Sequence, residues 1–537
     1  MKQFQARAGF LLVFLWSVSL SWAQEESHSM IHEADTEWVD EQIQSMTLDE
    51  KLGQLFMVAA YSNKDDQHLR QIDRLIEEEH IGGLIFFQGT PEAQVNLLER
   101  WQGKARWPLL VGQDAEWGLS MRLRNSFQFP WPLTVGATGD TALARRYGQA
   151  IGDHCRRIGV RLNFAPVVDI NTNPDTPIIN ARSFGEDPER VTRMSRSYIQ
   201  GLQNAGVMAC AKHFPGHGDT YQDSHKTLPT VDDSLDQLQN VELYPYRELA
   251  QGKLASVMVA HLNVPALDTT GKPTSLSKPT LDYLRSQTRF DGLVVTDALN
   301  MKGVSKQYAP GKVDLEALQA GNDLLLFPEN VARAKSEMRK ALRQGKLSEQ
   351  DIDKHVRRIL KAKSALGLAD RKPVVPGPGL AHDLFREKDQ ILTSELFAKA
   401  TTVLINRDKT IPVRNLRNKK FAVVTAGKDA GTTFAETLKN FAQVDHFSFD
   451  PENRDRLLAT LADYDLVIFG LYTANDNPWQ SYAIGSDVRE FIDQVSLQNR
   501  MIIDVFANPY SLKDLDVAHL AHGLIMSYQN DPAAERE

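Results

Sequence analysis

The feature that most limits the possible folds of this 537-residue chain is a regular series of eight short apolar segments between residues 55 and 327. Each segment is rich in Val, Ile, Leu or Phe and is too short for a typical helix, which indicates buried β-strands. In chain order they read LFMVAA, GGLIFF, PLLVGQD, RLNFAPVVDI, VMACAKHF, SVMVAHL, DGLVVTD and DLLLF.

Longer amphipathic segments separate these predicted strands. Stretches such as TALARRYGQAIGDHCRRIG and PERVTRMSRSYIQGLQNAG place apolar residues at steps of three and four, as one face of an α-helix requires. Eight alternating strand and helix units predict an α/β fold of the (β/α)8 TIM-barrel type, with a parallel sheet. An open, doubly wound sheet is the alternative that the pattern allows.

Polar residues follow five of the eight predicted strands at the point where the strand ends. In (β/α)8 barrels, the functional side chains lie at this carboxyl end. A single aspartate in this position could simply cap the next helix, but the repetition indicates a functional site. The polar residues concerned are Asp114, Asp169, Lys212 with His213, His261 and Asp297.

The first residues, 1–23, have the composition of a secretory signal peptide. Lys2 and Arg7 supply positive charge, an apolar stretch follows, and Ser21-Trp22-Ala23 is a plausible cleavage site. An uncleaved membrane anchor is the alternative. We expect export to the periplasm or the cell exterior, with no integral membrane span after cleavage.

The remaining chain divides into two domains. Residues 24–368 contain the eight repeated units and form the predicted catalytic domain. Residues 369–380 contain three prolines and two glycines, which predicts a linker. In residues 381–537, apolar runs again alternate with helical segments, which predicts a smaller α/β sandwich domain. Because its final residues, QNDPAAERE, resemble the start of a helix, we expect this domain to be truncated.

Charge and cysteine content argue against two classes of protein. The net charge is −8 and the chain has no basic block, so we expect no nucleic-acid partner. Two cysteines, Cys155 and Cys210, are too few for a disulfide framework, and both are expected to be buried free thiols.

The most specific motif is KHFPGHGDTYQDSHKTLP, at residues 212–229. Together with NFAPVVDI, ARSFGEDP, LVVTDALNM and AGNDLLL, it resembles glycoside hydrolase family 3, in particular its β-N-acetylglucosaminidase branch. The resemblance runs from about Trp38 to the predicted linker. It implies a retaining exo-β-N-acetylglucosaminidase that needs no metal or other cofactor and acts on carbohydrate.

The resemblance also implies three catalytic residues. Asp297 matches the family nucleophile, which forms a covalent glycosyl-enzyme intermediate. His225 matches the general acid and base, and Asp223 the carboxylate that orients its imidazole. Histidine suits this role because it titrates near neutral pH and can both give and take back a proton.

Five further residues match the family's sugar-binding positions: Asp114, Arg122, Arg182, Lys212 and His213. The family often shows D-x-E-G-G, whereas this chain has Asp114-Ala115-Glu116-Trp117-Gly118. The Trp117 indole either stacks on a neighbouring sugar or packs beneath its loop. We interpret His217 as support for the loop and His261 as a packing histidine.

Three other functions compete with this interpretation. A metal hydrolase could use the side chains of His213, His217, Asp223 and His225. A wall-binding protein without catalysis is a second alternative. Within the enzyme class, a histidine acid/base also permits phosphate to replace water, which would make the enzyme a phosphorylase. Peptidoglycan fragments and chitin-type oligosaccharides are both open as substrates.

Overall fold

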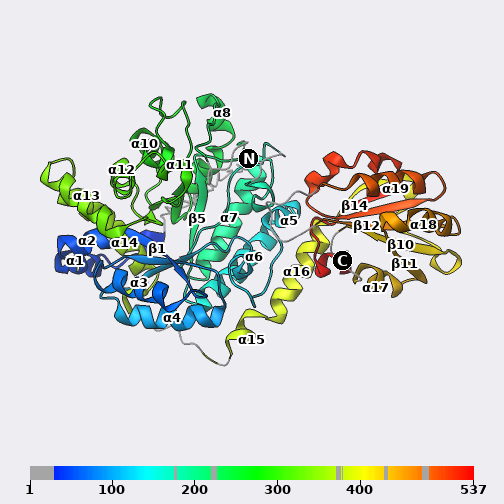
Figure 1. Ribbon diagram of the computed structural model, residues 1–537, viewed down its shortest axis with the longest axis horizontal. Helices are drawn as coiled ribbons and strands as arrows, with labels where there is room; N and C mark the ends of the chain where they lie inside the picture. Colours follow the sequence, from blue (N-terminus) through cyan, green and yellow to red (C-terminus); the bar gives the residue numbers. More distant parts are fainter. Residues whose placement is uncertain are drawn as a thin grey trace, which may run out of the picture.

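The computed structural model describes residues 30–173, 178–218, 220, 227–370, 377, 379–427, 433–473 and 483–537. Two domains lie side by side, a larger one built on a barrel and a smaller one built on an open sheet, joined by helix α16 (Glu387–Ala400) (Figure 1). Within the described ranges, no helix combines the length and apolar character that a membrane crossing needs. The predicted signal peptide, 1–23, lies outside these ranges.

The larger domain is built on an eight-stranded parallel sheet that closes on itself. Strands β1 to β7 are neighbours in chain order, and β8 pairs with β1. β7 and β8 meet at a bridge between Val295 and Leu324, beside a 3.0 Å hydrogen bond from Thr296 N to Leu324 O. The predicted barrel is therefore confirmed, and the open-sheet alternative is wrong. The strands are β1 (Phe56–Tyr61), β2 (Gly83–Phe87), β3 (Leu110–Gln113), β4 (Leu162–Asn163), β5 (Met208–Phe214), β6 (Ser256–Val259), β7 (Leu293–Thr296) and β8 (Leu325–Leu326).

Helices follow the strands and cover the outside of the barrel (Figure 1). Many of them begin at an Asp, Ser, Thr or Asn whose side chain accepts a hydrogen bond from the first turn, as Asp140 and Asp187 do. The helices of this domain are α1 (Thr36–Ser45), α2 (Leu48–Gln54), α3 (Asp66–Glu77), α4 (Pro91–Lys104), α5 (Pro132–Ala137), α6 (Thr141–Arg157), α7 (Pro188–Asn204), α8 (Leu235–Asn240), α9 (Tyr244–Ala250), α10 (Lys278–Gln287), α11 (Lys302–Ser305), α12 (Lys312–Ala320), α13 (Val331–Arg343) and α14 (Glu349–Ala365).

The barrel interior is closely packed with apolar side chains. Gly112 on β3 leaves room for Phe164, because a Cβ atom at this glycine would lie 2.8 Å from the phenylalanine ring.

Cys155 and Cys210 are both buried and free, which confirms the expectation for the two thiols.

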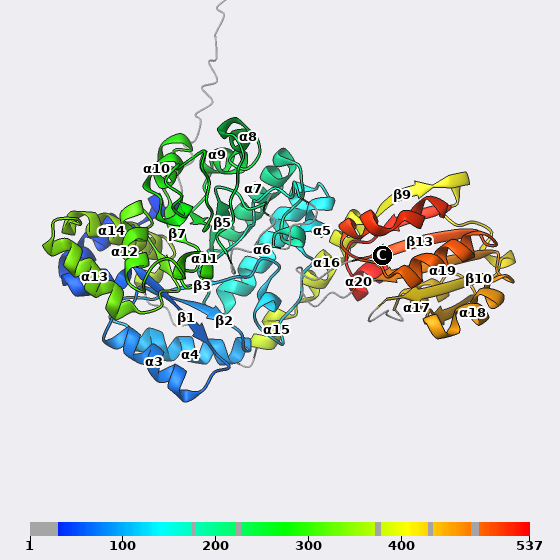
Figure 2. The same ribbon diagram turned by 45° about the horizontal axis from the view of Figure 1, so that its top comes forward.

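The smaller domain has a six-stranded sheet in the order β11-β10-β12-β13-β14-β9. All pairs are parallel except β14 with β9, which lies at the edge of the sheet (Figure 2). The sequence pattern did not identify β9 or β11, because Val403 and Leu404 of β9 are both 47% exposed and β11 is only partly buried. The strands are β9 (Thr402–Asn406), β10 (Phe421–Ala426), β11 (Val444–Ser448), β12 (Leu466–Tyr472), β13 (Met501–Phe506) and β14 (Gly523–Met526), with helices α17 (Thr433–Lys439), α18 (Arg454–Leu461), α19 (Ser486–Ser496) and α20 (Pro532–Arg536).

Helix α16, preceded by α15 (Leu380–Leu384), is attached to barrel helix α6 by charged side chains. His154 Nε2 lies 2.9 Å from Asp389 Oδ2, and both side chains are almost fully buried. Arg386 contacts Asp389 at 2.7 Å and Asp153 at 2.9 Å. Because buried charged groups must be paired, this cluster fixes the helix that leads into the second domain.

The smaller domain contains a buried carboxyl group that should make its stability depend on pH. Burial raises the pKa of Asp504 on β13 to about 7 from its ordinary 3.8, against the opposing effect of a 2.7 Å hydrogen bond from Ser527 Oγ. Between these two pH values, the unfolded chain loses a proton that the folded chain keeps. The free energy of unfolding therefore falls as pH rises through this window.

We expect Asp504→Asn to remove this dependence. Relative to the wild-type protein, the variant should gain stability between pH 4 and pH 8, by up to about 4 kcal/mol. Thermal and urea unfolding across this range measures the gain, with exposed Asp493→Asn as the control. An equal pH dependence in wild type and Asp504→Asn would contradict the assignment.

Candidate active site

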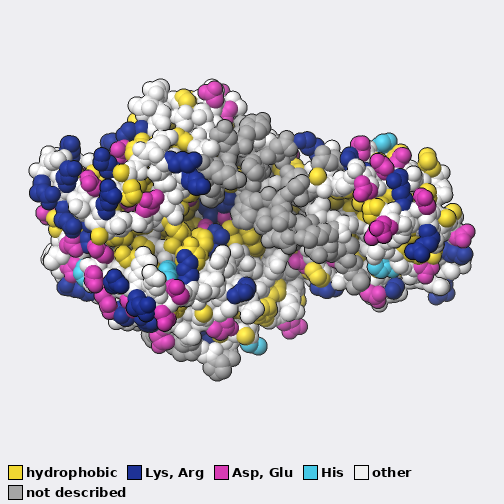
Figure 3. All heavy atoms as spheres, viewed as in Figure 1, with side chains coloured by type: hydrophobic (Ala, Val, Ile, Leu, Met, Phe, Trp, Pro, Cys, Tyr) yellow, Lys and Arg dark blue, Asp and Glu magenta, His cyan; other side chains and the backbone are white. Residues whose placement is uncertain are grey.

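The polar residues at the ends of the barrel strands lie at one mouth of the barrel. Lys212 and His213 belong to β5, Asp114 directly follows β3, and Asp297 directly follows β7. The face drawn in Figure 3 is hollowed near the middle of the barrel domain, and hydrophobic side chains gather there together with Lys or Arg side chains. Parallel strands bring all their carboxyl ends to the same rim, so residues far apart in the sequence become neighbours.

Lys212 is the centre of a buried ion network. Its Nζ lies 2.8 Å from Asp114 Oδ1 and 2.8 Å from Glu116 Oε1. The other oxygen of Asp114 accepts a 2.7 Å hydrogen bond from Arg122 Nη2. Only 2% of Lys212 is exposed, so these contacts are shielded from solvent.

Arg182 extends the network from the opposite side. It donates to Glu116 through Nε at 2.8 Å and through Nη2 at 2.7 Å, a two-point contact that fixes the plane of the guanidinium. Its Nη1 donates to the Ile178 carbonyl at 3.1 Å, and Nη2 lies 3.4 Å from His213 Nε2. Glu116 lies in the D-x-E motif of the sequence, but the motif alone predicts no role for this residue.

The cations keep both acids of this network ionised. Burial alone would raise the pKa of Asp114, but the charges of Lys212 and Arg122 outweigh it and hold this pKa well below its usual range. Burial also opposes ionisation of Glu116, but Arg182 and Lys212 lower its pKa to about 2. The network therefore presents fixed charges to a ligand over the whole physiological pH range.

Asn163 holds the backbone between these two acids. Its Oδ1 accepts from Ala115 N at 2.9 Å, and its Nδ2 donates to Ala115 O at 3.0 Å. Since Asn163 is the last residue of β4, a rigid strand fixes the Asp114–Glu116 segment. The sequence pattern does not predict this role for Asn163.

His213 is oriented by Asp169, which lies in the extended segment after β4. Asp169 Oδ2 lies 2.7 Å from His213 Nδ1, and Oδ1 accepts from His217 N at 2.8 Å. Burial alone would raise the pKa of Asp169, but the neighbouring His213 outweighs this effect, and the pKa of Asp169 lies below its ordinary value. If Nδ1 donates to this carboxylate, Nε2 is left as an acceptor toward Arg182.

The side chains of His217 and His261 are held by hydrogen bonds to neighbouring residues. His217 Nδ1 pairs with Thr220 Oγ1, and burial lowers the pKa of His217 to about 4, so its ring is neutral at physiological pH. His261 lies between Ser275 Oγ at 2.6 Å and the Ala298 carbonyl at 3.0 Å. These contacts agree with a supporting role for His217 and a packing role for His261.

Asp297 is held at the tip of β7. Its backbone N donates to Val259 O at 2.9 Å, and its Oδ1 accepts from Ala298 N at 2.7 Å. The side chain is partly exposed at the barrel mouth. The other two predicted catalytic residues, Asp223 and His225, lie outside the described part of the chain.

Three aromatic rings occupy the arc of the mouth between Asp297 and Asp114. Tyr61 and Phe87 are the last residues of β1 and β2, and Phe327 directly follows β8. The ring centroids are 5.9 Å (Tyr61–Phe87) and 5.2 Å (Phe87–Phe327) apart. The Arg122 guanidinium lies 4.3 Å from the centroid of Phe87. The mouth thus has a charged side and an aromatic side. The aromatic side was not predicted, because an aromatic residue at a strand end resembles ordinary core sequence.

Trp117 packs within the protein. It is only 7% exposed, and its ring centroid lies 6.5 Å from that of Trp131. Leu133 and Ala181 complete this apolar cluster, and Tyr510 of the smaller domain packs against it. Of the two interpretations of this indole, the structure favours packing beneath the loop.

The described residues do not bring together three or more His, Cys, Asp or Glu side chains in an arrangement that could hold a metal ion. The Nδ1 atoms of His213 and His217 are already engaged by Asp169 and Thr220. The other two residues of the proposed metal set, Asp223 and His225, are outside the described ranges.

The ion network predicts that Glu116 matters for stability as well as for site geometry. Glu116→Gln leaves the buried cations Lys212 and Arg182 short of one negative charge, and we expect it to lower the free energy of unfolding by about 3–5 kcal/mol. Glu395→Gln breaks a half-exposed pair with Arg146 and should cost less than about 1 kcal/mol. Denaturant unfolding of both variants at pH 7 tests this contrast, and equal losses would contradict it.

Comparison with known proteins places the chain in a family. The model of the glycosyl hydrolase family 3 N-terminal domain matches residues 47–362. The chain is 33% identical over 380 residues to beta-hexosaminidase A of Pseudoalteromonas piscicida, covering 64% of this chain and 62% of that relative. This relative is therefore considerably longer than the matched region.

Two further proteins match nearly the whole chain. A beta-N-acetylglucosaminidase/beta-glucosidase of Cellulomonas fimi is 30% identical over 530 residues, which cover 92% of this chain and 91% of the relative. The solved structure of a family 3 beta-N-acetylglucosaminidase from Paenibacillus sp. str. FPU-7 superposes with a TM-score of 0.75 at 30% identity, covering 92% of this chain and 95% of that one. Because the family model spans more than half of the sequence and both domains have counterparts in these relatives, the chain belongs to glycosyl hydrolase family 3 and is a glycoside hydrolase.

Proposed function

We propose that this protein is a retaining exo-β-N-acetylglucosaminidase that removes terminal N-acetylglucosamine from peptidoglycan fragments or chitooligosaccharides. The observation that carries the proposal is the charged network of Asp114, Arg182 and Lys212, which faces Asp297 across one barrel mouth. The names of the relatives, which include beta-hexosaminidase and beta-N-acetylglucosaminidase, support this choice of sugar.

The strand order explains why this arrangement suits a pyranose ring. β3 and β7 are four strands apart in either direction around the eight-stranded barrel, so Asp114 and Asp297 lie on opposite sides of the mouth. A sugar with C1 above Asp297 directs its outer hydroxyls at C3, C4 and C6 toward the charged network. Hydrogen bonds to charged groups contribute about 1.5–3 kcal/mol each, so a few of them hold one sugar ring.

In the proposed mechanism, Asp297 attacks C1 while His225 gives its proton to the glycosidic oxygen. The leaving group departs as an alcohol, and C1 is bonded to the Asp297 carboxylate. His225 then takes a proton from water as the water oxygen attacks C1, which releases the sugar and frees Asp297. Asp223 orients the imidazole throughout. The roles of His225 and Asp223 rest on the sequence motif.

The proposed substrates are consistent with the proposed place of action. We propose that residues 1–23 direct export, which would bring the enzyme to cell-wall fragments or to chitin-type material outside the cytoplasm. Cleavage near Ala23 can be checked by sequencing the N-terminus of the protein recovered from the producing cell.

Replacing the nucleophile tests the central assignment. Asp297→Ala should lower kcat on an aryl β-N-acetylglucosaminide by a factor of about 10⁴ or more, because no covalent intermediate can form. Asp291→Ala changes an exposed residue two positions before β7, paired with His32, and should retain activity. Both variants are compared by thermal unfolding, and full turnover by folded Asp297→Ala would refute the proposal.

Product analysis separates the remaining alternatives. We expect free N-acetylglucosamine from chitobiose or from defined muropeptides, with or without phosphate in the buffer. N-acetylglucosamine 1-phosphate in the phosphate arm would instead identify a phosphorylase. Faster cleavage of an aryl β-glucoside than of the N-acetylglucosaminide would indicate glucose as the preferred sugar. Loss of activity on treatment with a chelator would favour a metal-dependent hydrolase.

A further inference from the structure

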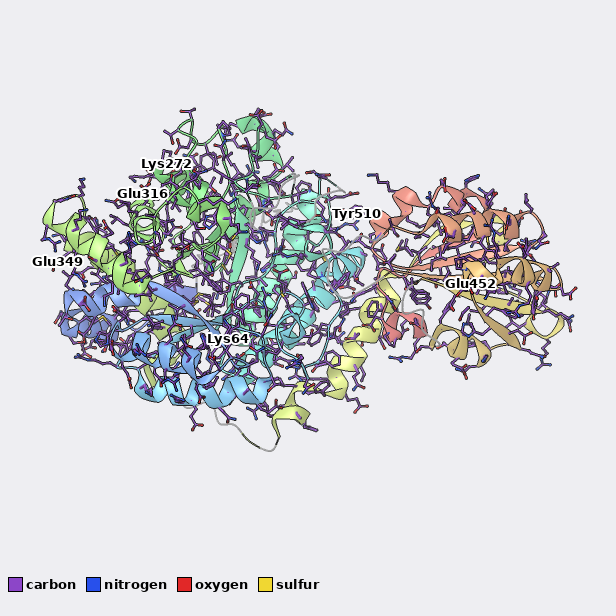
Figure 4. The ribbon with its side chains drawn as sticks, in the orientation of Figure 1. Lys64, Lys272, Glu316, Glu349, Glu452 and Tyr510 are labelled. Atoms are coloured by element: carbon purple, nitrogen blue, oxygen red, sulfur yellow. The ribbon has the colours of Figure 1, made fainter. Side chains whose placement is uncertain are left out.

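The smaller domain reaches the sugar-binding side of the barrel through the loop after β13. Asn508 in this loop is 5% exposed, and its Nδ2 donates a hydrogen bond to Asn180 Oδ1 of the barrel. Its own Oδ1 accepts from Tyr510 N at 3.0 Å, so both ends of the amide are used. Figure 4 shows Tyr510 on the side of the smaller domain that faces the barrel.

Asn180 begins the short 3₁₀ turn η3 (Asn180–Arg182), which carries Arg182. Its φ is +44°, a backbone conformation that asparagine tolerates better than most residues but that still has to be held in place. Asn171 Nδ2 donates to the Asn180 carbonyl at 2.7 Å from within the barrel. Asn508 binds the side chain of the same residue from the other domain. The turn is therefore fixed from two sides.

The position of this turn determines where the Arg182 guanidinium lies. The guanidinium contacts Glu116 at 2.7 and 2.8 Å and approaches His213, so a small shift of η3 changes the geometry of the whole charged network. Binding sites are sensitive to such displacements, because a misplacement of about 1 Å can cost a large factor in rate.

We propose that Asn508 is a positioning residue for the sugar site, through which the smaller domain holds Arg182 in its binding geometry. This proposal rests on the proposed function in one respect: the sugar binds at the charged network. It gives the smaller domain a role in substrate affinity, although Asn508 itself acts through Asn180.

The same interface offers a matched control. Gln529, which follows β14, is fully buried, and its Oε1 accepts a 3.0 Å hydrogen bond from Trp131 N. This contact joins the same two domains but goes to the segment before α5 instead of η3. A change at Gln529 should weaken domain contact to a similar degree without releasing Asn180.

The test compares steady-state kinetics of Asn508→Ala and Gln529→Ala in the full chain on an aryl β-N-acetylglucosaminide. We expect Asn508→Ala to lower kcat/KM about tenfold or more, mainly through KM, and Gln529→Ala to change it less than about twofold. Asn508→Asp provides a second variant that keeps the acceptor for Tyr510 N and removes the donor to Asn180. If Asn508→Ala does not fold, the kinetics of Asn508→Asp test the positioning role instead.

A double-mutant cycle separates positioning from a general loss of domain contact. In an Arg182→Ala background, Asn508→Ala should lower kcat/KM less than about twofold, since the residue it positions is gone. An undiminished effect in that background, or equal losses in the Asn508 and Gln529 variants, would overturn the proposal. Absence of turnover by the wild-type enzyme would instead overturn the proposed function, and the variants would then be compared by calorimetric binding of N-acetylglucosamine.

Discussion

A lysine shared by two buried carboxylates holds the mouth of the barrel together. Lys212 comes from β5, whereas Asp114 and Glu116 come from the loop after β3, so one ammonium group links two parts of the rim. Taking three charges out of water is costly, and the cost is met only because every charge has a partner at close range. The same pairing keeps the side chains in fixed positions before any ligand arrives, which reduces the entropy lost when a sugar binds.

The barrel provides the rigid frame for this network, and the smaller domain braces one side of it. Arg182 lies on a turn that Asn171 holds from the barrel and Asn508 from the other domain. Tyr510 packs against the cluster that buries Trp117. The second domain thus contacts the loops that carry the charged side chains, while the acid at the tip of β7 depends on barrel contacts from Val259 and Ala298.

Much of this architecture follows from local pattern. Eight apolar runs with helical segments between them were enough to predict the closed barrel, because a parallel strand buried on both faces leaves a continuous apolar signature. The polar residues after five of these runs predicted a site at the barrel mouth, because parallel strands bring their carboxyl ends to one rim. The half-exposed strand β9 and the aromatic residues Tyr61, Phe87 and Phe327 left no comparable signature, since an exposed edge strand and an aromatic residue at a strand end both resemble ordinary sequence.

The residues alone predicted which groups would carry the chemistry and that their strands would bring them to one rim, because side-chain type, motif and periodicity are local properties. How those groups are paired was settled by three-dimensional packing. That Glu116 joins Arg182 to Lys212, that Trp117 is buried instead of offered to a sugar, and that Asn508 reaches Asn180 all depend on segments up to 328 residues apart in the chain. Contacts over such separations arise from the closure of the barrel and the docking of the second domain, which no stretch of sequence encodes by itself.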